Sequence, residues 1–163
     1  MTDTKAKPLE QEKQKFKKMK KIFLLLGLMM LATSVAFSQQ ISLFDSEGEA
    51  RAYIDYDKDS TIFMWDGTPV AFIEKDVRGD LCVFGFNGSF LGWYKDGIIY
   101  DKKGYTVGAR KDAVNMIYRI EMSKGIQKIT SIRPITPITP ISPIFRSSWS
   151  NTSLSEFLFD GKK

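Results

Sequence analysis

The stretch TIFMWDGTPVAFI, from Thr61 to Ile73, decides the fold class of this chain. Two runs of β-branched and aromatic residues flank the pair Asp66-Gly67, and such runs favour strands. Asp-Gly between two such runs is a strong signal of a hairpin closed by a two-residue type I′ turn, because both central residues of that turn need positive φ. The stretch therefore predicts a β-hairpin.

The turn also sets a register, in which Phe63 faces Val70 and Ile62 faces Ala71. Similar turn signals occur at Asn87-Gly88, as a second two-residue turn, and at Ser46–Gly48 and Lys102–Gly104, as three-residue loops that end in glycine.

The pattern of this hairpin occurs four times along the chain. Each copy has a glycine, an aromatic residue four positions before it, an aliphatic residue five before it and a small residue four after it. The glycines are Gly48, Gly67, Gly88 and Gly104, the aromatic residues Phe44, Phe63, Phe84 and Tyr100, and the small residues Ala52, Ala71, Gly92 and Gly108. One hairpin is marginal in water, whereas four can share a core. We therefore predict an all-β domain over about residues 41–113, with four pseudo-symmetric hairpins, eight short antiparallel strands, around a common axis where the small residues crowd together.

The repeats carry a resemblance to a known family. The runs LFDSEG (43–48), IFMWDG (62–67), VFGFNG (83–88) and especially FLGWYKDGIIYD (90–101) resemble the four-fold β-flower proteins of Bacteroidetes. The later proline-rich stretch is also similar to family members. The resemblance implies a small, often exported protein with this fold and carries no catalytic motif. Arg51 and Ala109 depart from the pattern, which predicts less regular hairpins in the end copies.

Composition excludes several function classes. The chain has no histidine and one cysteine, so Ser-His-Asp and Cys-His nucleophiles, histidine zinc sites and an intramolecular disulfide of Cys82 are ruled out.

The net charge of +5 comes from residues 1–21, which hold eight lysines and three acids. The remaining residues are neutral overall, so we expect no nucleic-acid partner. We predict neither an enzyme nor a cofactor.

The N-terminus predicts export. Basic residues at 17–21 precede an uncharged segment, residues 22–37, and small residues at Ala36 and Ser38 suit a cleavage site after Ser38. This order is typical of a secretory signal peptide within residues 1–38, with translation starting at Met1 or Met19. The body is then periplasmic or at the cell surface. Alternatively, residues 22–37 remain as an inner-membrane anchor, with the body outside the cytoplasm.

The C-terminal part divides into an extended linker with a proline-rich arm (114–147) and a short helical region (148–163). Proline recurs every third residue over 134–143, which favours polyproline II and aligns Ile135, Ile138, Ile141 and Ile144 on one edge. The arm is either a stiff spacer or docks this isoleucine edge in an apolar groove of this protein or of a partner. Ser153 and Glu156 fit a capping box at the start of the helix.

Three groups of residues are weak candidates for chemistry. Asp55, Asp57 and Asp59 resemble part of a calcium loop, but strands flank them and Ser60 replaces the usual glycine, so a solvated turn is the alternative. Asp45, Asp66 and Asp101 are carboxylates that the repeats supply for a hydrolase, or else turn supports. Possible stacking residues for a sugar or peptide ligand, or else core residues, are Trp65, Phe72, Trp93 and Tyr94.

The sequence therefore predicts an exported, non-catalytic interaction or structural module with a protein or glycan partner. The alternative is a carbohydrate-binding module, or a carbohydrate-active hydrolase that uses the repeat carboxylates. A membrane is expected as a partner only through the N-terminal segment, if that segment stays uncleaved.

Overall fold

The computed structural model of the chain describes residues 6–31 and 39–162, which belong to two compact units divided between Phe37 and Ser38. In the first unit, α1 spans Ala6–Leu31. Among the described residues, no helix combines the length and the apolar character needed to cross a bilayer. The predicted cleavage position, Ser38, lies outside the described residues.

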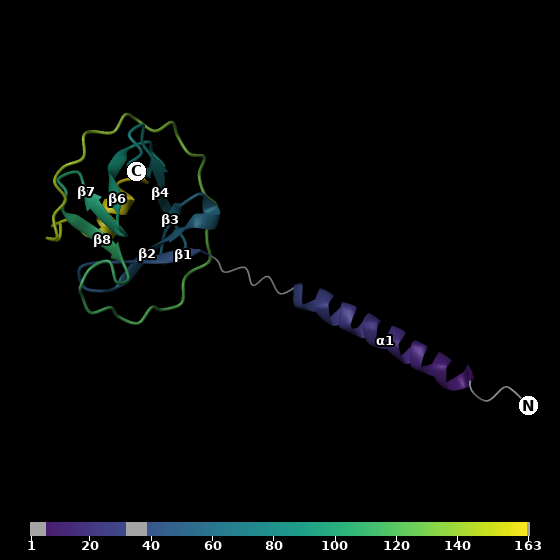
Figure 1. Ribbon diagram of the computed structural model, residues 1–163. Coiled ribbons are helices and arrows are strands. Elements are labelled where there is room, and N and C mark those ends of the chain that lie inside the picture. The colour runs from purple at the N-terminus through teal and green to yellow at the C-terminus, as the bar shows by residue number, and fades with distance from the viewer. Residues whose placement is uncertain (1–5, 32–38, 163) are drawn as a thin grey trace, which may run out of the picture. The chain divides into compact units, whose positions relative to one another are not determined.

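The second unit contains a closed antiparallel barrel of eight strands (Figure 1). The strands are β1 (Gln40–Phe44), β2 (Ala50–Asp55), β3 (Thr61–Met64), β4 (Pro69–Lys75), β5 (Leu81–Gly85), β6 (Phe90–Lys95), β7 (Ile98–Asp101) and β8 (Thr106–Arg110), with a 3-10 turn at Tyr56–Lys58. Each strand pairs with the next, and β8 pairs with β1. Closure removes exposed sheet edges. The predicted all-β fold of four hairpins around an axis is confirmed.

All four repeats close with the same three-residue turn, which corrects the type I′ turns predicted at Asp66-Gly67 and Asn87-Gly88. In the second copy, the Met64 amide donates to the Thr68 carbonyl at 2.7 Å, and the Gly67 amide donates to the Met64 carbonyl at 2.9 Å. Gly67 has a φ of +83°, whereas Asp66 does not have positive φ. This is a type I turn followed by a left-handed glycine. A pair with positive φ at both residues does occur at Asp96-Gly97, between two repeats.

A bulge at the same place in every repeat corrects the predicted register. Ile62 pairs with Ala71 as predicted, but Phe63 pairs with Pro69, so Val70 is the extra residue. The extra residues of the four copies are Arg51, Val70, Leu91 and Val107. Because the first and last copies have the same bulge, the prediction that they would be irregular is wrong.

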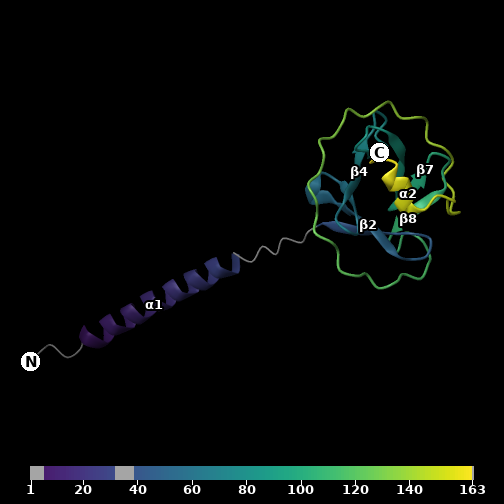
Figure 2. The same ribbon diagram turned by 180° about the vertical axis from the view of Figure 1, so that it is seen from behind.

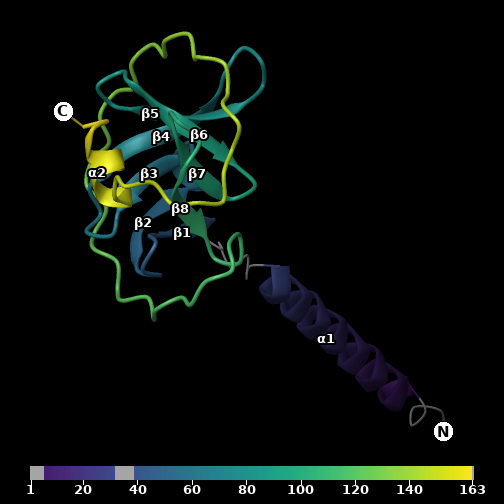
Figure 3. The ribbon, with the colours of Figure 1, turned by 90° about the vertical axis from the view of Figure 1, so that its left-hand side faces the viewer.

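A short helix, α2 (Leu154–Phe159), lies at one end of the barrel (Figures 2 and 3). Leu154, Phe157 and Leu158 are buried with the aliphatic interior of the barrel. A Cβ on Gly108 would lie 2.8 Å from the Leu154 side chain, and one on Gly92 would lie 3.2 Å from the Phe157 ring. Gly108 therefore makes room for this helix, whereas the nearest atom to a Cβ on Gly92 would be the Tyr100 carbonyl oxygen of the neighbouring strand, at 2.0 Å. Its predicted capping box is confirmed.

The outward faces of the strands carry an aromatic layer. Side chains alternate along a strand, so the neighbours of the aliphatic core residues point out of the barrel. Their rings contact each other, as in the stacked pairs Tyr53–Phe63 and Phe72–Phe84, with centroids 5.5 and 5.9 Å apart. The arm, residues 114–147, contains neither helix nor strand and runs around the outside of the barrel (Figures 1 and 2). The predicted linker thus surrounds the domain it follows.

Candidate functional site

The arm is held to the barrel at regular intervals of nine residues. Three of its backbone amides donate hydrogen bonds to the carbonyls of the turn glycines. The pairs are Arg119 to Gly48 at 2.8 Å, Lys128 to Gly67 at 2.9 Å and Arg146 to Gly104 at 2.8 Å. Pro137, nine residues after Lys128, has no backbone N–H to donate. In the third repeat, Pro134 lies beside the turn glycine Gly88 instead. Nine residues are three periods of the three-residue pattern of the arm, so each barrel repeat matches three periods of the arm.

The arm approaches three of these turns, at Gly48, Gly67 and Gly104, so closely that only glycine fits. A Cβ on Gly48 would lie 2.0 Å from the Ile117 carbonyl oxygen, and a Cβ on Gly67 would lie 2.0 Å from that of Ile126. Glycine is therefore required at these turns for two reasons: it adopts positive φ without strain, and its lack of a Cβ lets the arm backbone approach closely.

One edge of the arm faces the aromatic layer of the barrel. Its side chains recur every third residue and contact rings of the first, second and fourth repeats. The contacts are Tyr118 on Phe44, Lys124 over Tyr53, Arg133 over Phe72 and Phe145 on Tyr100, with distances of 4.8, 4.4, 4.5 and 4.6 Å to or between ring centroids. Cations over ring faces are favourable because the face of a ring is negative. The inward edge is thus mixed aromatic and polar.

A polar latch fixes the arm beside the turn that joins β4 to β5. The Thr139 hydroxyl donates to the Asp76 carboxylate at 2.6 Å, and Arg78 donates to the Thr139 and Pro140 carbonyls at 3.0 and 2.6 Å. The Asp76 side chain is 3% exposed and pairs with Arg78 at 3.0 Å. The hydrogen bond from Thr139, together with those from the Asp80 and Arg78 amides and the Arg78 side chain, lowers the pKa of Asp76 to about 2, and burial opposes that change.

The opposite edge of the arm presents a row of isoleucines to solvent. These nine side chains recur every third residue, except at Ser123, and are 84–97% exposed. They are Ile117, Ile120, Ile126, Ile129, Ile132, Ile135, Ile138, Ile141 and Ile144. We call them the isoleucine row. The prediction that this edge docks in a groove of the protein itself is wrong, because the barrel binds a different edge of the arm.

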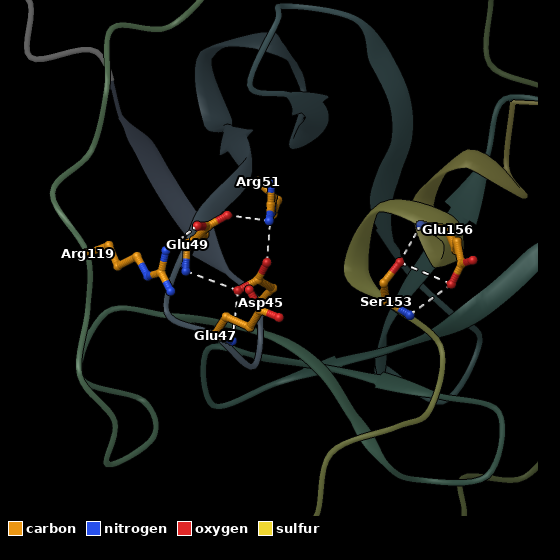
Figure 4. Close-up of polar contacts among 7 residues, drawn as sticks. All are labelled: Asp45, Glu47, Glu49, Arg51, Arg119, Ser153 and Glu156. Atoms are coloured by element: carbon orange, nitrogen blue, oxygen red, sulfur yellow. Dashed lines mark hydrogen bonds and ion pairs between the residues drawn. The ribbon is translucent and has the colours of Figure 1, made fainter.

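An ion-pair network links the arm to the first hairpin (Figure 4). Arg51 donates from Nε to Asp45 at 2.7 Å and pairs with Glu49, which also accepts from Arg119 of the arm at 2.6 Å. The hydrogen bond to Asp45 raises the pKa of Arg51, against the opposing effect of burial. Arg51 thus replaces the buried aliphatic residue of the other copies with an ion pair to Glu49, the residue that contacts the arm.

The structure places the three predicted carboxylates in turns. Asp45 accepts from the amides of Glu47 and Glu49 at 2.9 and 3.0 Å, and Asp101 likewise accepts from Lys103 and Tyr105 at 2.8 and 3.0 Å. Asp66 accepts from the Thr68 amide at 2.9 Å, which lowers the pKa of its carboxyl group. Asp45, Asp66 and Asp101 line three different pockets around α2, so no single cleft is lined by a pair of them.

The run Asp55, Asp57 and Asp59 is not arranged around a shared point. Asp55 is buried, and its carboxylate accepts hydrogen bonds from the side-chain amides of Gln40 and Gln127 at 2.9 and 2.7 Å. Burial raises the pKa of Asp55, but these hydrogen bonds outweigh burial and hold it below its ordinary value. In the part of the chain that the structure describes, no three Asp, Glu, Cys or His side chains gather as metal ligands.

The predicted stacking residues lie in different environments. Phe72, Trp93 and Tyr94 are buried, so they present no open ring face to a ligand. Trp65 is half-buried; its indole N–H donates to the Met122 carbonyl at 3.2 Å, and Lys124 lies 5.2 Å from its ring centroid. The arm therefore covers part of the one predicted platform residue that reaches the surface.

The comparisons with known proteins agree with this architecture. A family model described as 4-fold beta flower protein matches residues 41–158. The chain belongs to this family. Comparisons with curated proteins and with solved structures found no match. Because the match extends from β1 into α2, the arm and the helix are part of the flower fold and not an appendage to it.

The flower also has a pocket that sequence reasoning missed. It has a volume of about 680 Å³ and lies between the β7–β8 turn, the segment after the arm, and α2. Trp149 and Tyr105 line it together with Asp101 and Asn151. Trp149 lies there because its neighbours Ser148 and Ser150 bond to the backbone of Thr106. The sequence pattern gave no signal of this pairing, which joins residues more than forty positions apart.

Proposed function

We propose that this beta-flower protein is an exported, non-catalytic interaction module whose contact surface is the isoleucine row. The exposure of the row supports the proposal. Large apolar patches on a soluble protein typically mark a surface that binds something, and isolated apolar side chains do not. Nine exposed isoleucines recur at every third residue of the arm, with one interruption at Ser123, and this repetition distinguishes the row from isolated apolar side chains.

Export is part of the proposal and rests on the N-terminal sequence. Lysines followed by an uncharged segment are the features that a secretion pathway recognises. Fractionation of cells that express the full chain should recover the flower outside the cytoplasm, with a mass that corresponds to cleavage after Ser38. A cytoplasmic product of full mass would contradict this part.

The absence of catalysis is supported by the state of the candidate carboxylates. A general acid needs a raised pKa, but hydrogen bonds lower the pKa of Asp66. Asp45 and Asp101 are occupied by turn amides. Activity screens on glycoside substrates should therefore give no turnover above that of the variant Asp101→Asn.

The contact surface is tested by capture from an envelope extract. The full chain and a variant with Ile135→Thr, Ile138→Thr and Ile141→Thr are immobilised side by side. Because all three side chains are exposed, the variant should fold and remain as stable as the parent. We expect the parent to retain material that the variant does not. Identical capture by the two would contradict the proposal.

A second candidate function, carbohydrate binding, is favoured by the pocket at Trp149. An indole and a phenol beside Asp101 and Asn151 combine stacking surfaces with hydrogen-bonding groups, as sugar sites do. A glycan array should then show ligands that Trp149→Ala loses and the isoleucine variant keeps. Binding that is equal in all three proteins would exclude this pocket.

A further inference from the structure

One part of the isoleucine row differs from the rest in its charge. Residues 129–144 contain six isoleucines of the row and a single charged residue, Arg133. The guanidinium of Arg133 lies over the Phe72 ring at 4.5 Å and donates to Thr61 Oγ1 at 3.2 Å, so it is directed to the barrel. The outward edge of this segment, which we call the neutral strip, is apolar along its whole length.

We propose that the neutral strip is a self-association surface, which packs against the neutral strip of a second copy of this chain. The proposal rests on the proposed function and names the partner of that contact surface.

The spacing of the strip makes it complementary to itself. In the polyproline II conformation, which proline at every third position favours, a chain rises about 3.1 Å per residue, so isoleucines three residues apart are separated by roughly 9.3 Å. A side chain placed midway between two of them is about 4.7 Å from each along the axis, close to the roughly 4.0–4.5 Å of apolar contact. A second strip, antiparallel and shifted by half a period, therefore fills the gaps of the first. A two-fold axis generates this arrangement from identical chains.

Charge favours a second copy over a lipid surface. Two neutral strips meet without like-charge repulsion. Surfaces that bind anionic bilayers usually combine apolar side chains with outward lysine or arginine, which the neutral strip lacks. The first part of the arm contains the charged residues Arg119, Glu121, Lys124 and Lys128, and it is not part of the proposed contact.

The area of the strip predicts a weak complex. An isoleucine side chain offers roughly 100 Å² of apolar surface, so six supply about 600 Å² for each copy, somewhat below the ~800 Å² of a standard interface. The arm follows the outside of the barrel, so two convex strips touch over part of their length (Figure 1). We therefore expect a reversible dimer with a dissociation constant in the micromolar to millimolar range.

Sedimentation velocity over a concentration series tests the proposal on the full chain. The parent is compared with the variant Ile135→Thr, Ile138→Thr and Ile141→Thr, and with a control that changes three exposed apolar residues outside the strip, Val77→Thr, Ile117→Thr and Ile120→Thr. All three proteins have the same N-terminal region, so association through that region is common to them. The strip variant should associate at least tenfold more weakly than the parent, because burial of each isoleucine is worth about tenfold in affinity. The control should match the parent.

Cross-linking locates the contact. Cys82 is buried, and burial raises the pKa of its thiol to about 12, so it does not compete with an introduced thiol. Mild oxidation should join Ile138→Cys chains into dimers and leave Val77→Cys chains monomeric. Dimers of Val77→Cys in equal yield would overturn the proposal.

Three results separate this proposal from the proposed function. A parent that stays monomeric to about 1 mM, yet binds phosphatidylcholine vesicles or an envelope component that the strip variant does not, overturns self-association and leaves the contact surface standing. A parent that shows neither behaviour overturns both. Equal association of parent and strip variant overturns association through the neutral strip and leaves the proposed function standing.

Discussion

Isoleucine occupies opposite environments in the two main parts of the flower. In the barrel, Ile54, Ile62 and Ile99 are fully buried. In the arm, the nine isoleucines of the row are almost fully exposed, although the arm lies directly on the barrel. The residue type is the same, so hydrophobicity alone does not explain the difference.

The difference follows from the groups that the side chains of each part contact. A strand alternates between two faces, and closure of the barrel turns one face into an interior that only apolar side chains fill well. The arm has three edges, and the barrel surface that it meets offers glycine carbonyls and ring faces. Backbone amides, cations and hydroxyls suit those groups better than an aliphatic side chain does. The isoleucines are therefore left on the edge that the barrel does not use.

The sharpest test substitutes isoleucine in both parts. Ile62→Ala removes a fully buried side chain from the barrel and should destabilise the protein by about 2–5 kcal/mol. Ile138→Ala, in the arm, should change stability by less than about 0.5 kcal/mol in dilute solution. Urea unfolding followed by tryptophan fluorescence measures both. Similar losses at the two positions would mean that the arm buries its isoleucines in solution.

Glycines with and without the arm above them give the second test. Gly67 and Gly79 both have positive φ, +83° and +89°. A Cβ at Gly79 meets nothing within 4 Å, so Gly79→Ala should cost roughly 1–2 kcal/mol for its backbone conformation alone. Gly67→Ala also collides with the Ile126 carbonyl and should cost roughly 2–4 kcal/mol. Equal costs in urea unfolding would show that the arm does not press on this turn.

A pair of serines compares the helix that closes the barrel with the arm. Ser153 caps α2, and its hydroxyl accepts from the Glu156 amide at 3.2 Å. Ser153→Ala should lower stability by about 1 kcal/mol, since an N-cap typically contributes this much. The exposed Ser147 at the end of the arm is the control, and Ser147→Ala should be neutral within about 0.5 kcal/mol. Thermal unfolding followed by circular dichroism distinguishes the two, and a neutral Ser153→Ala would contradict the role of the cap.

The smallest expected effect is the pH dependence of the latch at Asp76. Its pKa is lowered to about 2 in the folded protein, so its stabilising contribution is fully present above about pH 4. The contribution is lost as the pH falls from about 4 towards 2, because the unfolded state then binds the proton more readily. The melting temperature of Asp76→Asn should therefore fall less over this range than that of the parent. Val77→Thr, an exposed change without a titratable group in the same turn, should behave as the parent does. Parallel curves for the parent and Asp76→Asn would contradict a stabilising role of the Asp76 carboxylate.

The hairpins were predictable because their signals are local. A strand run, a glycine and a second strand run lie within fifteen residues, and four copies reinforce each other. The capping box of α2 is equally local. The bulge at Val70 was not predictable from the turn. A two-residue turn without a bulge and a three-residue turn with a bulge both pair Ile62 with Ala71, so this pairing does not distinguish them. The Asp-Gly and Asn-Gly pairs suggested a shorter turn than the chain adopts.

The arm was predicted only in part. Proline at every third residue indicated its extended form, but the isoleucine period begins at Ile117, before the first of these prolines. The nine-residue spacing of Arg119, Lys128, Pro137 and Arg146 is also present in the sequence. This spacing predicts contacts with the barrel only when the turn glycines are known to lie at regular intervals around it. The pocket at Trp149 had no local signal at all.

By itself, the sequence determined which residues share a face. Period two in the strands and period three in the arm follow from backbone geometry, which is a property of neighbours along the chain. The tertiary structure alone decided which face of the arm meets the protein. That choice depends on the carbonyls and rings that four separate hairpins expose at the barrel surface, and these come together only when β8 pairs with β1 and the barrel closes.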